Sequence, residues 1–236
     1  MPYGFYGFDY TYFLFIVPAL IVTMYAQAKV SSTFSKYSRV GTVRNITGAE
    51  AARAVAEHGG ASGVSVRQIA GKLTDNFDPR TNVISLSEAV YGSSSVASVG
   101  VAAHEAGHAV QTAHGYLPNK IRAALLPVTN VGSRLSFPLI IIGLILPVQY
   151  DFVVYAGIAL FALVVLFQLA TLPVEFNASS RAIESLGETG ILYPDELEGA
   201  KKVLRAAAMT YLAASFSAFM NLLRLLFLAG NRRGRD

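Results

Sequence analysis

Four long apolar runs constrain the fold of this chain more than any other feature of its sequence. They cover residues 10–28, 136–148, 152–174 and 206–229. A helix that crosses a bilayer needs roughly 20 mostly apolar residues. The second run is shorter than this, so we expect its helix to begin earlier, near Leu125. Charged residues make up only 14% of the 236 residues, whereas soluble domains carry roughly 25%. The sequence therefore predicts a membrane α-helical protein with about four transmembrane helices.

The residue types that are absent or sparse limit the chemistry of this chain. It has no cysteine, which rules out disulfides and thiolate metal ligands. A metal ion would therefore have to bind histidine, aspartate or glutamate side chains. The net charge is only +4, and the basic residues are scattered, whereas nucleic-acid binding needs a clustered basic face. We therefore expect no nucleic-acid partner.

The apolar runs divide the chain into five segments. The sequence P-V-Q-Y-D forms a tight turn between the second and third runs, which predicts a membrane hairpin. The last run contains Arg224, whose charge is costly in mid-bilayer, so this run either crosses the membrane or packs as a buried helix. The predicted segments are an N-terminal transmembrane anchor (1–28), an α+β segment (29–120), the transmembrane hairpin (121–174), a second polar segment (175–205) and a C-terminal hydrophobic helix with a basic tail (206–236).

The first polar segment predicts both helices and strands. The sequence T-G-A-E at residues 47–50 is a capping box, which begins a helix that ends at Glu57 before a glycine pair. Residues 64–66 and 83–86 alternate apolar and polar side chains, as half-buried strands do. The sequence predicts a further helix over residues 93–113. Together these elements predict a small α+β unit joined to the membrane helices.

Basic residues near the spans predict the orientation in the membrane. Lys29, Lys36 and Arg39 follow the first run, whereas the turn of the hairpin carries Asp151. Since lysine and arginine are enriched in cytoplasmic loops, both features place the α+β segment in the cytoplasm. The basic C-terminal tail contradicts this orientation if the last run crosses.

The predicted helix over residues 93–113 contains the motif H-E-A-G-H. Residues four apart lie on one helix face, so His104 and His108 can present two imidazoles to one ion. Glu105 lies beside them, where its carboxylate can take a proton from a metal-activated water and pass it to a leaving amine. Two imidazoles and a carboxylate suit Zn²⁺, with one position left for water. The motif predicts one zinc ion per chain and peptide hydrolysis.

Two residues are candidates for the third zinc ligand. His114 has the spacing of the pattern H-E-x-x-H-x-x-G-x-x-H, but Gln111 stands where that pattern has the glycine of a sharp turn. On a continuous helix, His114 would lie roughly 80° around the axis from His104. Glu175 follows the third apolar run, so the hairpin returns it to the side of the histidines, where a carboxylate is costly unless paired or metal-bound. We therefore expect Glu175 to be the third ligand and His114 to end its helix.

Three stretches of the sequence carry a resemblance to one family. They are A-A-H-E-A-G-H-A-V-Q (102–111), L-P-V-E-F-N-A-S-S-R-A (172–182) and T-D-N-F-D-P-R-T-N-V-I-S-L-S-E-A-V-Y (74–91). Together they resemble the YugP-type neutral zinc metallopeptidases of bacterial membranes. More distantly, the chain is similar to the HtpX and CAAX prenyl endopeptidases, which are gluzincins.

The resemblance implies a role for each residue of the site. It makes His104, His108 and Glu175 the ligands of a zinc cofactor in a gluzincin-like unit, with Glu105 as the general base. It also implies a multi-pass protein of the bacterial cell membrane that acts on protein or peptide substrates.

One departure from the HtpX-like motif concerns the support of the metal. That motif has an aspartate four residues after the ligand glutamate, where this chain has Ser179, with Asn177 nearby. These two residues are candidates to support the ligands in place of the missing carboxylate. Arg181 is a candidate to stabilise an oxyanion, although a solvated or lipid-facing role is the alternative.

The resemblance also gives the second predicted strand a possible role. In gluzincins, an edge strand above the active-site helix pairs with the extended substrate. The residues concerned are Val83, Ile84, Ser85 and Leu86. The alternative is an ordinary strand in a small sheet.

The sequence therefore predicts a membrane-bound zinc endopeptidase. One alternative is a non-catalytic membrane scaffold with a structural metal site. Another is a zinc protease that cleaves within the membrane, although the histidine pair lies outside the apolar runs.

Overall fold

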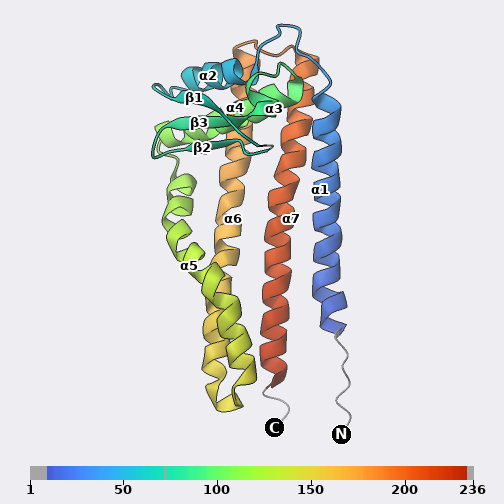
Figure 1. The fold of residues 1–236 in the computed structure, drawn as a ribbon, viewed down its shortest axis with the longest axis vertical. Helices are drawn as coiled ribbons and strands as arrows, with labels where there is room; N and C mark the ends of the chain where they lie inside the picture. The colour runs from blue at the N-terminus through green and yellow to red at the C-terminus, as the bar shows by residue number, and fades with distance from the viewer. Residues whose placement is uncertain (1–9, 72, 233–236) are drawn as a thin grey trace. The chain divides into compact units, whose positions relative to one another are not determined.

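The computed structural model describes residues 10–71 and 73–232 (Figure 1). Residues 1–9 of the predicted anchor and 233–236 of the predicted basic tail lie outside the described residues. In chain order the elements are the π-helix η1 (Tyr12–Ile16), α1 (Val17–Tyr37), α2 (Gly48–His58), β1 (Ser65–Ile69), β2 (Asn76–Asp78), β3 (Val83–Ser87), α3 (Glu88–Tyr91), α4 (Val96–Ala113), α5 (Leu117–Ile145), the 3-10 helix η2 (Val148–Tyr150), α6 (Asp151–Glu188) and α7 (Pro194–Arg232).

The described part of the chain has 4 helices that are long and apolar enough to cross a membrane. They cover Tyr12–Tyr37, Leu117–Ile145, Val148–Glu188 and Pro194–Asn231. With one small three-stranded sheet, this confirms the predicted membrane helical protein with a small α+β unit. The last helix is longer than the predicted hydrophobic helix, because the polar residues from Pro194 onward belong to the same helix as the apolar run.

The chain folds as two compact units. The first contains Met1–Tyr25, Ile121–Thr171 and Tyr211–Asp236, and the second contains Ala26–Lys120 and Leu172–Thr210. The division of the chain into five segments stays a prediction.

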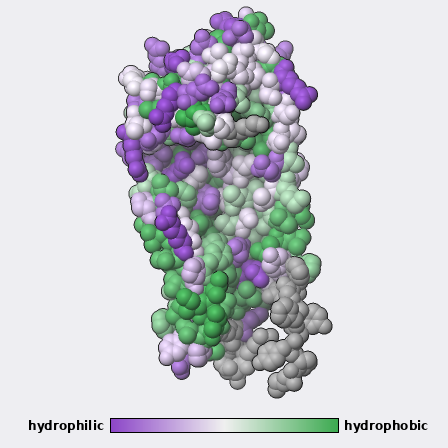
Figure 2. All heavy atoms as spheres, viewed as in Figure 1, coloured by the Kyte–Doolittle hydropathy of each residue, from purple (hydrophilic) through white to green (hydrophobic). Residues whose placement is uncertain are grey.

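The first unit consists of apolar helices. Its core includes Ile140, Val154, Ile158 and Leu225, and the visible surface of α5 is mostly hydrophobic (Figure 2). Arg224 lies within the last apolar run, where its Nε donates to Thr11 Oγ1 at 3.3 Å and its guanidinium lies 4.9 Å from the centroid of the Tyr12 ring. These contacts offset the cost of a charge in an apolar helix.

The second unit holds the sheet and the motif helix. Its core is formed by small and branched side chains of α2, α4 and β3, joined by residues of α6 and α7. Helix α2 begins as predicted, because Thr47 Oγ1 accepts from the Glu50 amide at 3.3 Å while the Glu50 carboxylate accepts from the Thr47 amide at 2.8 Å. In Figure 2, polar residues gather over the sheet and α2.

The sheet has the strand order β1-β3-β2. Strand β3 pairs with β1 in parallel and with β2 antiparallel. The prediction that Val83, Ile84, Ser85 and Leu86 form an edge strand is therefore wrong, since β3 is central and has neighbours on both sides. The resemblance to gluzincins implied the edge position, and β2, which lies in a stretch rich in turn-forming residues, was not predicted as a strand.

Candidate metal centre

Helices α4 and α6 are in close contact at Gly107, the glycine of the H-E-A-G-H motif. A Cβ at this position would lie 2.4 Å from the carbonyl oxygen of Ala178. Real Cβ atoms do not come this close to a backbone atom, so any side chain here would force the two helices apart. Ala178 lies one helical turn after Glu175 on α6, and Gly107 directly precedes His108 on α4. The contact between Gly107 and Ala178 therefore brings the turn that carries Glu175 against the histidine pair.

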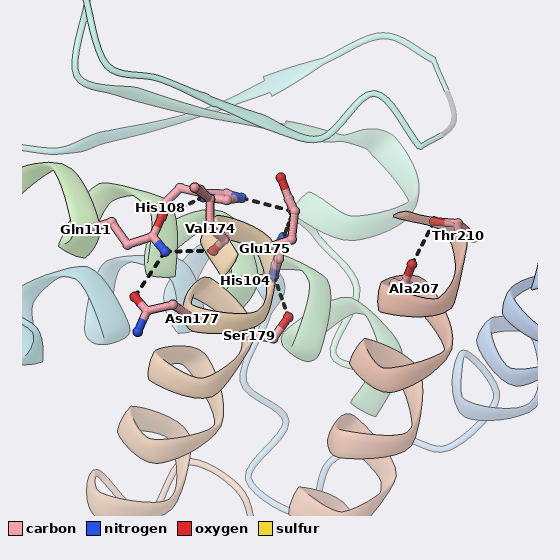
Figure 3. A network of polar contacts seen from close by, with 9 residues as sticks. All are labelled: His104, His108, Gln111, Val174, Glu175, Asn177, Ser179, Ala207 and Thr210. Atoms are coloured by element: carbon pink, nitrogen blue, oxygen red, sulfur yellow. Dashed lines mark hydrogen bonds and ion pairs between the residues drawn. The ribbon is translucent and has the colours of Figure 1, made fainter. Parts of the chain in front are cut away.

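The side chains of His104 and His108 from α4 and of Glu175 from α6 converge on one another (Figure 3). The Oε2 atom of Glu175 lies 3.3 Å from Nε2 of His104 and 3.5 Å from Nε2 of His108. Their candidate ligand atoms all lie within 4.8 Å of one another. Glu175 is only 2% exposed. A buried carboxylate facing two imidazole nitrogens is a donor set that fits Zn²⁺.

The outer nitrogen of His108 is held by Gln111, which is completely buried. The Nε2 atom of Gln111 donates to the carbonyl oxygen of Val174 at 2.7 Å. Because a carbonyl can only accept, this bond fixes the orientation of the amide and turns Oε1 toward His108 Nδ1, 3.0 Å away. Nδ1 must then be the donor. The Nε2 atom of neutral His108 therefore keeps its lone pair for the metal site.

Ser179 occupies the equivalent position beside His104. Its hydroxyl lies 3.1 Å from Nδ1 of His104, so Nε2 is again the nitrogen that faces Glu175. A hydroxyl can accept this hydrogen bond as a carboxylate does, but without a full negative charge. The residue that replaces the expected aspartate thus still contacts the histidine.

Asn177 and Arg181 extend these contacts away from the centre. The Oδ1 atom of Asn177 accepts from Gln111 Nε2 at 3.0 Å and from Arg181 Nε at 2.8 Å. The guanidinium of Arg181 also lies 3.1 Å from His114 Nδ1. Among the described residues, the converging group does not include His114, which caps the C-terminal end of α4.

The charges at the centre favour protonation of His108. Burial opposes the charged imidazolium, but the hydrogen bond to Glu175 and the negative charges of Glu105 and Glu175 outweigh it and raise the pKa of His108. Glu105 is half-buried next to His104 on α4. The Glu105 side chain projects from a different side of α4 than the two histidines. Its negative charge nevertheless acts on His108.

The sequence did not predict the role of Gln111. In the sequence, Gln111 stands out only because it replaces the glycine of the pattern H-E-x-x-H-x-x-G-x-x-H. Its position three residues after His108 places both side chains on one helix face, and a polar residue there can reach the histidine. The sequence pattern contains this signal, but it does not indicate that the Val174 carbonyl lies opposite.

Two histidines four residues apart on α4, with a buried glutamate from α6, form a donor set of the kind that zinc peptidases use. The family described as "Putative neutral zinc metallopeptidase" matches residues 12–230 of this chain. The chain belongs to this family.

A curated relative supports the same assignment. The chain is 42% identical over 225 residues to "Putative membrane protease YugP" of Bacillus subtilis (strain 168), an alignment that covers 95% of this chain and 98% of that protein. No solved structure matches the chain.

Proposed function

We propose that this protein is a membrane-bound endopeptidase that depends on one zinc ion. The observation that carries the proposal is the convergence of His104 Nε2, His108 Nε2 and the Glu175 carboxylate within 4.8 Å. Three protein ligands leave one coordination position open, as catalytic zinc sites require. Bound zinc would supply the Lewis acidity that activates water and polarises a peptide carbonyl.

The residues of this chain would prepare that chemistry in two ways. Gln111 and Ser179 hold the outer imidazole nitrogens, so the inner nitrogens are oriented before a metal binds. The Glu105 carboxylate takes a proton from the attacking water and delivers it to the amine that leaves when the peptide bond breaks.

We also propose that the site lies on the cytoplasmic side of a bacterial cell membrane. The second unit carries Lys29, Lys36 and Arg39 at the end of the first apolar run. Such basic residues beside a span favour the cytoplasm.

The variant Glu105→Gln tests the peptidase proposal. It keeps the volume of the side chain and removes the base. We expect the purified variant to retain zinc and to cleave an unfolded protein such as casein at least about 100-fold more slowly. The matched control is Glu57→Gln, an exposed position in α2, which should cleave at the wild-type rate.

The same assay separates the alternatives. A non-catalytic scaffold would give equal, background-level cleavage by the wild type and by Glu105→Gln. A protease that cleaves only within the bilayer would cut a transmembrane substrate and leave casein intact. Either result would contradict the proposal.

A further inference from the structure

A hollow of about 430 Å³ lies between α1 and α7 in the second unit. We call it the basic hollow. Its lining residues on α1 are Lys29, Ser32, Thr33, Lys36 and Tyr37, and those on α7 are Lys202, Arg205, Ala206 and Met209. In each helix these positions recur at intervals of three or four residues, so each helix turns one continuous face toward the hollow.

The basic hollow concentrates positive charge. Lys29, Lys36, Lys202 and Arg205 are all exposed, and its lining contains no acidic side chain. Across the described residues, none of these four cations forms an ion pair with a carboxylate. Four like charges around one hollow repel one another, so a bound anion would be favourable.

The lining also offers groups that suit a phosphate ester. The hydroxyl of Thr33 can donate a hydrogen bond to a phosphate oxygen, beside the ammonium groups. The hydroxyl of Ser32 donates to the carbonyl oxygen of Lys29 at 3.1 Å. Ala206, which is 3% exposed, and Met209 supply an apolar side to the same hollow. A ligand with an anionic head and an apolar body matches this combination.

The wall on which Tyr37 lies is tightly packed. A Cβ at Gly199 would lie 2.8 Å from Cε1 of Tyr37, so α1 and α7 meet here without an intervening side chain. The Nζ atom of Lys36 lies 5.5 Å from the centroid of the Tyr37 ring. The hollow is thus built on a fixed contact between two helices.

The position along the chain indicates the source of the ligand. In α1, Lys29 follows Tyr25 by four residues, or about 6 Å along the axis, and Ile21, Met24 and Tyr25 are apolar and exposed. In α7, Arg205 precedes the last apolar run directly. Cations at the end of a membrane span lie at the level of lipid headgroups, where basic pockets between helices bind anionic lipids.

We propose that the basic hollow binds the phosphate headgroup of one anionic phospholipid. This site is distinct from the candidate metal centre and does not depend on the proposed peptidase activity. The lipid would fix α1 against α7 where both helices leave the apolar segments.

Native mass spectrometry of the full-length protein in detergent tests the proposal. The wild type, offered equimolar phosphatidylglycerol and phosphatidylcholine, should retain one phosphatidylglycerol. The variant Lys36→Gln/Lys202→Gln/Arg205→Gln should bind it at least about tenfold more weakly, because each juxtamembrane cation contributes to the attraction. The control Arg39→Gln/Arg53→Gln/Arg80→Gln removes the same charge from exposed positions outside the hollow and should bind as the wild type does.

Two further arms distinguish the source of the anion and guard against misfolding. Inorganic phosphate at the same concentration carries the charge without acyl chains and should displace little lipid. In the wild type, retention should fall as ammonium acetate rises from about 0.1 M to about 1 M. Equal lipid binding by both triple variants, full displacement by phosphate, or retention that is indifferent to salt would each overturn the proposal.

Discussion

The side-chain oxygen of Gln111 lies 3.0 Å from Nδ1 of His108, and the amide that carries it is oriented by the carbonyl of Val174. One glutamine thus couples the motif helix α4 to the turn of α6 that supplies Glu175. Because Val174 precedes Glu175 in the chain, the amide group that orients His108 through its oxygen also holds, through its nitrogen, the backbone next to the proposed third ligand.

The variant Gln111→Leu should weaken zinc binding by about 10- to 100-fold, the usual effect of removing a hydrogen-bond partner of a metal-bound histidine. Competition with a chromogenic chelator measures the affinity. The control Gln68→Leu makes the same change at an exposed position of β1 and should bind zinc as the wild type does. Unchanged affinity in a folded Gln111→Leu protein would contradict the role assigned to this amide.

The variant Gly107→Ala should separate α4 from α6. The new methyl group would overlap the Ala178 carbonyl, and overpacking of this kind typically costs about 1–3 kcal/mol. We expect a lower thermal unfolding midpoint and reduced zinc content. Gly92→Ala is the matched control, because a Cβ at Gly92 meets nothing within 4 Å. Equal midpoints and equal zinc content in the two variants would show that the helices do not need this glycine.

The cap of α2 predicts a pH-dependent stability. The backbone N–H and hydroxyl of Thr47 both donate to the Glu50 carboxylate and hold the pKa of Glu50 below its usual value. A lowered carboxyl pKa stabilises the fold above the pKa of the unfolded chain, and this contribution is lost as the pH falls through the folded pKa. Thr47→Ala should cost about 1 kcal/mol at neutral pH, and less in acid.

Thermal unfolding of the wild type and Thr47→Ala at pH 7 and in steps down to about pH 2 measures this difference. The exposed change Glu57→Gln in the same helix serves as the control. A gap between the wild type and Thr47→Ala that is as wide in acid as at neutral pH would be evidence against the charged cap.

The absence of cysteine makes the proposed orientation directly testable. Ser62→Cys places a single thiol in the second unit, and Gln149→Cys places one in the turn between α5 and α6; both positions are exposed. In intact bacterial cells, a membrane-impermeant maleimide should label the Gln149→Cys protein and reach the Ser62→Cys protein only after permeabilisation. The opposite pattern would place the metal centre outside the cell.

Local signals in the sequence predicted much of this fold. The apolar runs predicted the membrane helices, and the capping box beginning at Thr47 predicted the start of α2. In contrast, β2 forms in a turn-rich stretch because it pairs with β3, a tertiary effect that no local pattern contains. The resemblance to gluzincins therefore wrongly implied that β3 lies at an edge of the sheet.

For the candidate metal centre, too, the sequence predicted some residues of the site but not others. Helical spacing paired His104 with His108, and the cost of a carboxylate beside a membrane span indicated Glu175. The roles of Gly107 and Gln111 depend on which backbone atoms of α6 lie opposite them. The Val174 carbonyl lies 63 residues after Gln111 in the chain, and only the packing of the two helices brings these atoms within reach.

Zinc analysis of purified Glu175→Ala and His114→Ala proteins tests the central claim most directly. Both variants should fold, as circular dichroism and size-exclusion chromatography can verify. If Glu175 completes the ligand set, the wild type and His114→Ala retain one zinc ion per chain, and Glu175→Ala loses it. Zinc retained by Glu175→Ala and lost from His114→Ala would contradict the ligand set proposed for this protein.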